Sequence, residues 1–347
     1  MDEVAEYTRR IKAVQGVLSD KGIDWLTVSG EKNMRYLFGV ETGRGVISAG
    51  SSTLWVRGVY EGVYERFFEK APYRVRTYRP GAIESYFKRV KPDVVGFEDV
   101  SYSTLKHLKK KLGVKRARIV DVVETLRMIK SPYELRLLRQ SARMAKKGME
   151  TAFKAVREGV PELYAVAEIE AAIRREGSES PPFESGMICA AGVHGADIHA
   201  HPSKRRIKRG LVVVDLGARY RGYHSDMTRT LPVGRLTKKE KEVSEAVENI
   251  KDEVIDSLTV GGKIADVHGL ADEKIKSLGY EFHHLIGHGV GLEIHEKPSI
   301  SPESKLVLKE GMVFTIEPGI YLPGRFGARF EDTIHLAKNG PVNLTRM

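Results

Sequence analysis

Hydrophobic positions in the first third of the chain follow two different spacings. Residues 3–21 carry apolar side chains every three or four positions, which is the spacing of an amphipathic helix. Four short apolar runs, at 25–28, 45–48, 53–58 and 93–99, are each typical of a β-strand, and helical segments fall between them. This alternation predicts an α/β domain whose sheet is mainly parallel or mixed and ends near residue 124.

The sequence pattern changes between residues 125 and 131, from short strand-like runs to a long helical stretch. Ser131 and Pro132 can open a long helix as its N-cap and first turn, and a second helix is predicted from Pro161 to about Arg175. From residue 183 onward short strands separated by glycine dominate, with helices expected at 237–258 and 264–278. The chain of 347 residues therefore predicts two domains, each able to bury a core. Their expected bounds are 1–125 and 126–347, and the expected fold class is α/β (α+β).

Composition narrows the class of protein. No apolar run is long enough to cross a bilayer, so we expect no membrane partner. Residues 1–14 are acidic early and lack an apolar signal core, and the chain has one cysteine, Cys189. Both features favour the cytoplasm.

The net charge of +11 raises the question of a nucleic-acid partner. The densest basic run, Lys106 to Arg118, places Leu105, Leu108 and Leu112 at helical spacing, so its lysines fit the solvated face of an amphipathic helix. No zinc-finger, helix-turn-helix or RNA-binding signature accompanies the charge. We therefore do not expect nucleic acid as a partner, and the surplus charge would instead suit an anionic substrate terminus.

A hairpin in the second domain carries the first two residues with candidate chemistry. In 211–230 two strand-like runs flank a turn around Arg221 and Gly222, so Asp215 and Asp226 should lie opposite each other. Two carboxylates at one point of a sheet need cations, because repulsion and desolvation otherwise force one of them to bind a proton. The alternative is that Asp215 caps a turn and Asp226 is exposed.

Two further segments add histidines and glutamates. Residues 282–298 carry His284, His288 and His295 among glycines that let another group approach the backbone. Residues 311–336 predict two strands, with Glu317 and Glu331 inside otherwise apolar runs, and a buried glutamate is rare unless it is paired or metal-bound. Oxygen ligands with one imidazole favour Mn²⁺, Co²⁺ or Zn²⁺, and two such ions activate a water for hydrolysis. The sequence therefore predicts a binuclear metallohydrolase.

With these segments in this order, the chain resembles the pita-bread metallopeptidases, which include prolidases, aminopeptidase P, methionine aminopeptidases and creatinases. Residues 33–39 (NMRYLFG) resemble the amino-terminal creatinase-like domain, and the run from Leu126 (LRMIKSPYELRLLRQSARMA) resembles the entry into the catalytic domain. The resemblance implies a creatinase-like α/β domain followed by a pita-bread catalytic domain. That layout is typical of the prolidase and aminopeptidase P branch.

The resemblance also implies a role for each ligand. Asp215 would bind one metal ion through both oxygens, His288 and Glu317 would bind the other, and Asp226 and Glu331 would bridge the pair. Glu317 would accept the proton of the water that attacks the scissile carbonyl.

Outer residues are implied in the same way. His295 would contact the substrate around the scissile amide, and His199 would steady the tetrahedral intermediate. His201 lies on the same loop and could take that second role, because the Pro-His-Gly usual in the family is Ile-His-Ala here.

Three more positions match the proline-cleaving branch. His284 would help line the pocket for the residue after the scissile bond. Tyr321 and Arg329 match positions that hydrogen-bond the metal carboxylates, and such partners orient ligands. The alternative for this pair is a tyrosine and an arginine on the surface.

Together these features predict a metal-dependent exopeptidase that hydrolyses Xaa-Pro bonds with two divalent ions, Mn, Co or Zn. A prolidase acting on dipeptides is the first expectation, and an aminopeptidase P-like enzyme acting on longer peptides is the alternative. A catalytically inactive binding module is a third possibility, but such relatives typically lose metal ligands. The expected substrate is a small peptide with proline in second position, and the resemblance implies a homodimer.

Overall fold

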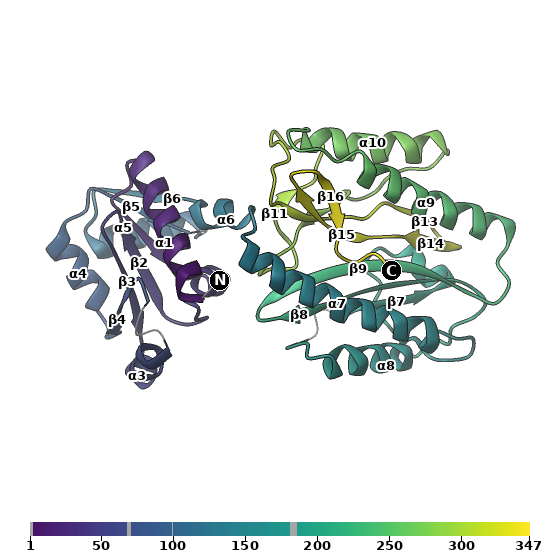
Figure 1. Ribbon diagram of the computed structural model, residues 1–347, viewed down its shortest axis with the longest axis horizontal. Coiled ribbons are helices and arrows are strands. Elements are labelled where there is room, and N and C mark those ends of the chain that lie inside the picture. Colours follow the sequence, from purple (N-terminus) through teal and green to yellow (C-terminus); the bar gives the residue numbers. More distant parts are fainter. Residues whose placement is uncertain (1–2, 68–70, 99, 181–185) are drawn as a thin grey trace. The chain divides into compact units, whose positions relative to one another are not determined.

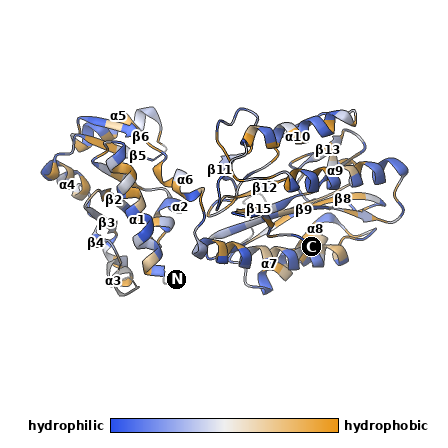
Figure 2. Ribbon diagram, turned by 45° about the horizontal axis from the view of Figure 1, so that its top comes forward, coloured by the Kyte–Doolittle hydropathy of each residue, from blue (hydrophilic) through white to orange (hydrophobic). Residues whose placement is uncertain are grey.

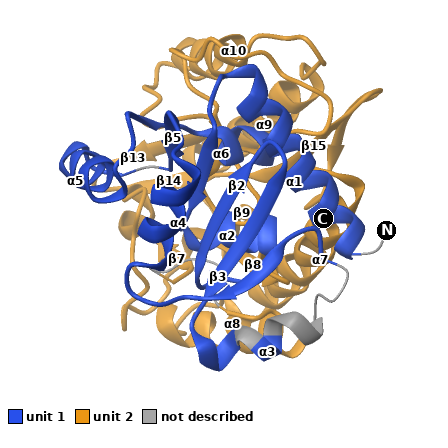
Figure 3. Ribbon diagram, turned by 90° about the vertical axis from the view of Figure 1, so that its left-hand side faces the viewer, with its two compact units in different colours: residues 1–127 blue, residues 128–347 orange. Residues whose placement is uncertain are grey.

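A computed structural model describes residues 3–67, 71–98, 100–180 and 186–347 (Figure 1). The chain divides into two compact units, Met1–Arg127 and Met128–Met347, coloured separately in Figure 3. In the described part of the chain, no helix has both the length and the apolar character that a membrane span requires.

The first unit is built on a six-stranded mixed sheet in the order β4-β3-β2-β1-β5-β6. Strand β1 lies antiparallel to β2 and parallel to β5, which confirms the predicted mixed sheet. All four predicted strands are present, and β4 and β6 add to them. The strands are β1 (Trp25–Val28), β2 (Arg44–Ser48), β3 (Ser51–Val56), β4 (Arg74–Thr77), β5 (Val94–Phe97) and β6 (Arg116–Ile119).

Amphipathic helices surround this sheet. One of them contains the first part of the basic run, as far as Leu112. Leu112 is buried, and Leu105 and Leu108 pack against the core that includes Phe87 and Phe97. The helix stops at Leu112, however, because Gly113 adopts a left-handed conformation, and the end of the run forms β6 instead. The helices are α1 (Glu3–Asp20), α2 (Glu31–Phe38), α3 (Gly58–Phe67), α4 (Ala82–Val90), α5 (Tyr102–Leu112) and α6 (Val122–Arg127).

The second unit begins with two helices packed on a three-stranded antiparallel sheet, β7-β8-β9. Apolar side chains of the helices, such as Met149 and Ile169, share one core with Val212 and Leu216 of the sheet. In Figure 2 the strands β8 and β9, like the helices, show both hydrophobic and hydrophilic colours. The elements are α7 (Pro132–Ala155), α8 (Glu162–Arg175), β7 (Ile188–Ala191), the 3-10 turn η1 (Gly192–Ala196), β8 (Gly210–Tyr220) and β9 (Tyr223–Val233).

A second layer of the same unit pairs two helices with two further sheets. Strands β11-β10-β12-β15-β16 form one sheet and β13-β14 the other. Val247 and Ile275 of the helices pack against Phe314 and Ile334 of the five-stranded sheet. The elements are α9 (Lys238–Asp256), α10 (Ile264–Ser277), β10 (His288–Gly289), β11 (Glu296–Ser299), β12 (Val313–Ile316), β13 (Gly319–Leu322), β14 (Phe326–Arg329), β15 (Asp332–Ala337) and β16 (Gly340–Asn343).

Helix α7 begins where the sequence predicted. Ser131 Oγ accepts a hydrogen bond from the backbone N–H of Glu134, and the Glu134 carboxylate accepts one from the N–H of Ser131. This reciprocal capping box satisfies two N–H groups that the helix itself leaves unpaired. The second oxygen of Glu134 accepts a bond from Tyr223 of β9, so the helix start is also tied to the hairpin.

We expect Ser131→Ala to lower the free energy of unfolding by about 1 kcal/mol, because the N–H of Glu134 loses its acceptor. Urea denaturation followed by circular dichroism measures this. Ser19→Ala is the control, since Ser19 is an exposed serine within α1. An equal loss in both variants would contradict the role of the cap.

Candidate metal centre

The hairpin of β8 and β9 places the two aspartates on one face, but not directly opposite each other. Arg221 and Gly222 both have positive φ and make a two-residue turn. That turn sets the register, which pairs Asp215 with Thr228 and Asp226 with Gly217. The prediction of directly opposite aspartates is therefore wrong by two residues. They are diagonal neighbours on the same face, which still lets both reach one site.

Neither aspartate fits the alternative prediction, in which Asp215 caps a turn and Asp226 is exposed. Asp226 lies within β9 and is 4% exposed, and Asp215 lies within β8 rather than at a turn. Both side chains therefore point into the protein and not into solvent.

The two glutamates lie where strands break, which corrects the prediction of two continuous strands. Glu317 separates β12 from β13, and Glu331 separates β14 from β15. At both points the chain passes between the five-stranded sheet and the two-stranded sheet. Pro318, which has no N–H, follows Glu317, and the N–H of Glu331 bonds to the carbonyl of Thr228 in β9. The break at Glu331 thereby joins the second layer to the hairpin.

Glycines on both sides of His288 let other parts of the backbone come close to it. A Cβ on Gly287 would overlap the carbonyl of Thr315, and one on Gly289 would overlap the carbonyl of Lys297. The groups that approach these glycines are therefore the protein's own neighbouring strands. This close packing holds His288 on β10, beside β12.

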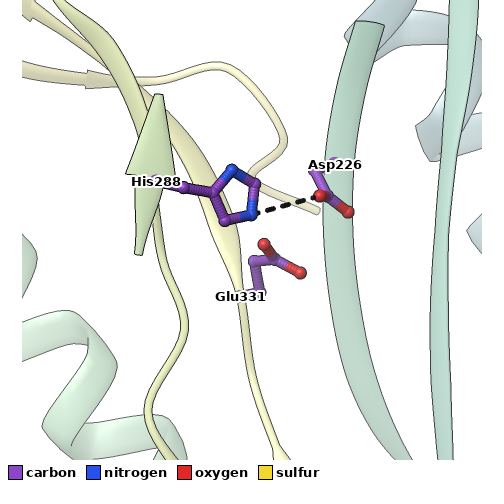
Figure 4. A group of neighbouring side chains, drawn as sticks. All are labelled: Asp226, His288 and Glu331. Atoms are coloured by element: carbon purple, nitrogen blue, oxygen red, sulfur yellow. Dashed lines mark ion pairs between the residues drawn. The ribbon is translucent and has the colours of Figure 1, made fainter. Parts of the chain in front are cut away.

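Three of the predicted ligands form a tight group. Asp226, His288 and Glu331 each offer a ligand atom, and these atoms all lie within 4.8 Å of one another (Figure 4). His288 Nε2 lies 3.7 Å from Asp226 Oδ2 and 3.4 Å from Glu317 Oε1. Asp215 acts electrostatically on Asp226, Glu317 and Glu331. All five predicted ligands therefore belong to one neighbourhood.

The chemistry of these atoms fits divalent cations. His288 Nδ1 lies 3.2 Å from the carbonyl oxygen of Gly289, which can only accept, so Nδ1 carries the proton and Nε2 presents a lone pair. That lone pair faces carboxylate oxygens, which are also acceptors. Among the residues that the structure describes, buried Oδ1 atoms of Asp215 and Asp226 have no hydrogen-bond partner. Acceptors directed at one another without donors require a cation or a proton between them.

Protonation is the only other way to relieve this arrangement. Burial, then repulsion from neighbouring carboxylates, raises the pKa values of Asp226 and Glu331 well above their usual range. Burial raises the pKa of Glu317 to about 7, against the opposing effect of Arg329. Burial, assisted by His295, lowers the pKa of His288 to about 3 and keeps it neutral. A site whose carboxyls have raised pKa values and whose imidazole is uncharged can exchange its protons for metal ions.

Arg329 and Tyr321 are both buried and connect Asp215 to His284. Arg329 donates to Asp215 Oδ2 at 2.7 Å and to Tyr321 Oη at 3.1 Å, and Tyr321 Oη lies 3.0 Å from His284 Nε2. His284 Nδ1 donates to the carbonyl of Leu285, so Nε2 accepts the tyrosine proton. Burial lowers the pKa of His284 to about 4. Neither Tyr321 nor Arg329 is a surface residue, and of the two only Arg329 bonds directly to a carboxylate of the predicted ligand set.

The outer histidines lie around this group. The ring centroid of His295 is 4.1 Å from that of His288. Burial lowers the pKa of His295, and the nearby His199 adds to the effect, as it does for His284. His199 and His201 are both exposed, and of the two only His199 acts electrostatically on the site histidines.

Two threonines that the sequence analysis missed orient the glutamates. Thr228 Oγ1 donates to Glu331 Oε2 at 2.7 Å, and Thr315 Oγ1 donates to Glu317 Oε1 at 3.4 Å. Thr228 stands two residues after Asp226, and Thr315 two before Glu317. Alternate residues of a strand share a face, so the strand period was the signal that could have identified both.

A buried ion cluster lies behind Glu331. Asp332 accepts hydrogen bonds from Arg229 Nη2 and Lys251 Nζ, both at 2.7 Å, and these cations lower its pKa although burial opposes them. Arg229 Nη1 also donates to the carbonyl oxygen of Glu331 at 2.6 Å. The backbone of Glu331, which is expected to bridge the two metal ions, is therefore held by charged groups outside the predicted ligand set.

Comparison with known proteins now identifies the family. The model of metallopeptidase family M24 matches residues 136–338, and that of the creatinase/prolidase N-terminal domain matches residues 10–129. The chain belongs to metallopeptidase family M24. This confirms the predicted family, the metallopeptidase class and the α/β (α+β) fold.

Individual relatives match along the whole chain. The metallopeptidase is 35% identical to an Xaa-Pro dipeptidase of Pyrococcus horikoshii, over 97% of each chain. Its structure is similar to the prolidase from Pyrococcus horikoshii, with a TM-score of 0.89, 34% identity and 98% of each chain covered. It is also similar to the X-Pro aminopeptidase from Thermotoga maritima, with a TM-score of 0.83, 29% identity and coverage of 94% of this chain and 96% of that one.

We expect the free energy of unfolding of chelator-treated protein to fall as pH rises from about 6.5 to about 8. Carboxyls with raised pKa bind more protons folded than unfolded, so their contribution is present below the unfolded pKa and lost through the folded one. For Glu317 that loss runs from the ordinary value of 4.5 to about 7 and is complete above it, so Asp226 and Glu331, whose pKa values are raised well above their usual range, carry the loss to higher pH. Histidines with lowered pKa act in the opposite sense, but their effect ends near the ordinary value of 6.5. Urea unfolding across this window measures the slope.

Glu331→Gln supplies the control for this pH dependence. It removes one titrating carboxyl, so the stability of the chelated variant should fall less steeply over the same window. Wild-type stability that stays constant or rises there would show that the buried carboxyls do not titrate as described.

Proposed function

We propose that this metallopeptidase is an Xaa-Pro dipeptidase that hydrolyses the bond before a carboxy-terminal proline. The proposal rests above all on one observation: three predicted ligands form a tight group, with Glu317 beside His288 and Asp215 acting electrostatically on its carboxyls, in a chain that is similar along its whole length to an Xaa-Pro dipeptidase. The alternative of an inactive binding module has less support, because the residue types of a metal-ligand set are all present.

The ligand roles follow the expectation from the family. His288 and Glu317 would hold one ion, Asp215 the other, and Asp226 and Glu331 would lie between them. Two divalent ions bound there supply a water of near-neutral pKa and polarise the scissile carbonyl. Which ion serves in the cell, Mn²⁺, Co²⁺ or Zn²⁺, stays a prediction.

The surrounding residues would manage protons and orientation. Glu317, with a pKa of about 7 before a metal binds, would take a proton from the attacking water. The proline nitrogen has no N–H and must gain a proton as it leaves, and His295, whose ring centroid lies 4.1 Å from that of His288, would be a candidate donor. His284 has both ring nitrogens engaged, so it would serve as a neutral wall of the proline pocket rather than as a donor.

We expect chelator-stripped protein to release no free proline from Ala-Pro and to regain activity with Mn²⁺, Co²⁺ or Zn²⁺. Glu317→Ala should remain at least about 100-fold less active with every ion, because it loses both a ligand and the proton acceptor. A colorimetric proline assay measures both. No activity with any ion, on Ala-Pro or on a longer Xaa-Pro peptide, would reject the function.

The similarity to the X-Pro aminopeptidase from Thermotoga maritima favours a second candidate, an enzyme acting on longer peptides. Comparing Ala-Pro with Ala-Pro-Ala-Ala under the same conditions separates the two. A dipeptidase prefers the first substrate, since its cleft is closed beyond proline, whereas an aminopeptidase accepts the second.

Three further expectations belong to this proposal. The unit from Met128 onward would carry the catalysis and the amino-terminal unit would not. The homodimer implied by the family stays a prediction, and so does the cytoplasmic location, with which the single buried Cys189 is consistent. Size-exclusion chromatography with light scattering would measure the oligomeric state.

A further inference from the structure

A buried carboxylate outside the metal cluster has no role in the function described so far. Glu162, the first residue of α8, is fully buried. Its Oε1 accepts a hydrogen bond from the N–H of Ala191 at 3.0 Å, and its Oε2 accepts bonds from the N–H and hydroxyl of Ser203, at 3.1 and 2.9 Å. His194 Nδ1 lies 3.0 Å from both oxygens. One carboxylate thus joins the two ends of segment 191–203.

These bonds do not serve the helix on which Glu162 lies. The N-cap of α8 is Pro161, which makes no side-chain cap, and every bond described above goes to segment 191–203. A role in starting the helix therefore does not account for the burial of a charged side chain here. Burying a carboxylate is costly unless its oxygens are satisfied, so the segment supplies what keeps Glu162 in place.

Segment 191–203 reaches the metal centre at its middle. The carbonyl oxygen of Ile198 accepts a bond from Arg329 Nη1 at 3.1 Å. At the turn η1, the backbone of Gly195 lies so close to Gly327 of β14 that a Cβ on Gly327 would overlap it. His199 follows Ile198 directly and acts electrostatically on the site histidines, as described above.

We propose that Glu162 is a positioning residue that clasps both ends of segment 191–203 and thereby holds His199 beside the metal centre. The catalytic part of this inference rests on the proposed function, whereas the clasp itself does not. Arg329 holds the middle of the segment and Glu162 holds its ends. Backbone pairing already places the two ends, Ala191 beside Val212 of β8 and the carbonyl of Ser203 on the N–H of Leu163, and the Glu162 carboxylate adds the side-chain restraint that ties them to each other.

Glutamine at position 162 tests this clasp with little change of shape. A carboxylate accepts at both oxygens, but an amide has one oxygen and one NH₂ group. Its NH₂ group must face either the N–H of Ala191 or the N–H of Ser203, and two N–H donors cannot bond to each other, although the Ser203 hydroxyl can turn and accept. Glu162→Gln therefore loses a backbone hydrogen bond at one end of the segment and weakens the clasp there.

Trypsin cleavage directly after the segment can report this weakening of the clasp. Lys204, Arg205, Arg206, Lys208 and Arg209 are exposed and follow Ser203 directly, so trypsin can cut there once the segment loosens. We expect full-length Glu162→Gln protein loaded with Mn²⁺ to be cut within 204–209 about ten-fold faster than wild type, at an unchanged Tm. Glu168→Gln, an exposed glutamate of the same helix, should match wild type. Cleavage of Glu162→Gln at the wild-type rate would overturn the clasp.

Steady-state kinetics on Ala-Pro test the positioning of His199. Glu162→Gln should lower kcat about ten-fold or more while KM changes less than about two-fold, because a misplaced group weakens transition-state contacts more than binding. In a His199→Ala background the same substitution should cause no further loss. Independent, multiplying losses would overturn the link to His199. If wild type has no activity on Xaa-Pro peptides, the proposed function fails and the trypsin result still decides the clasp.

A second variant decides the question if Glu162→Gln unfolds as a whole. Ser203→Ala removes the hydroxyl donor at one end and leaves the carboxylate in place. The Ser203 hydroxyl also accepts from the N–H of Arg205, so faster cleavage within 204–209 must come with a lower kcat on Ala-Pro to support the clasp. Faster cleavage at an unchanged kcat, or cleavage at the wild-type rate, would overturn it.

Discussion

Repulsion between buried carboxylates is the interaction on which the rest of this structure depends. Asp226 and Glu331 come from different layers of the second unit, and Glu317 joins them at a strand break. Burial and mutual repulsion raise the pKa of each of these three carboxyls, and the neutral Nε2 of His288 adds another acceptor rather than a donor. Such a group is stable only with protons or cations among its oxygens. The repulsion that the fold builds in is therefore relieved when metal ions bind.

The scaffold keeps these acceptors close against their repulsion. The β8–β9 hairpin has eleven paired positions and a two-residue turn, so the aspartates cannot slide past each other. Arg229 holds the carbonyl of Glu331 from behind, and Arg329 holds Asp215 from the side. Glu162 applies the same principle farther out, where one carboxylate satisfies both ends of a loop. In each case a buried charged group with defined partners adds a restraint to backbone or side chains that strand pairing has already brought together.

Local signals in the sequence were sufficient for much of the fold. Ser131 and Glu134 form the expected capping box, because that motif involves only four consecutive residues. The apolar runs at residues 25–28 and 45–48 are strands, because their burial follows from composition. The runs around Glu317 and Glu331 were predicted as single strands and are each broken. Nothing local distinguishes an unbroken strand from one that passes between two sheets, since the partner strands are distant in sequence.

The sequence by itself determined which residues could form a metal site, because carboxylates and an imidazole inside apolar strands are rarely stable without a cation among them. It also determined the turn at Arg221 and Gly222. Only the tertiary structure decided how these residues meet: the diagonal placement of Asp215 and Asp226, the tautomer of His288, and the chain of contacts from Asp215 through Arg329 and Tyr321 to His284. Register, tautomer and long-range hydrogen bonds depend on which distant segments pack together, and that information is not local to any motif.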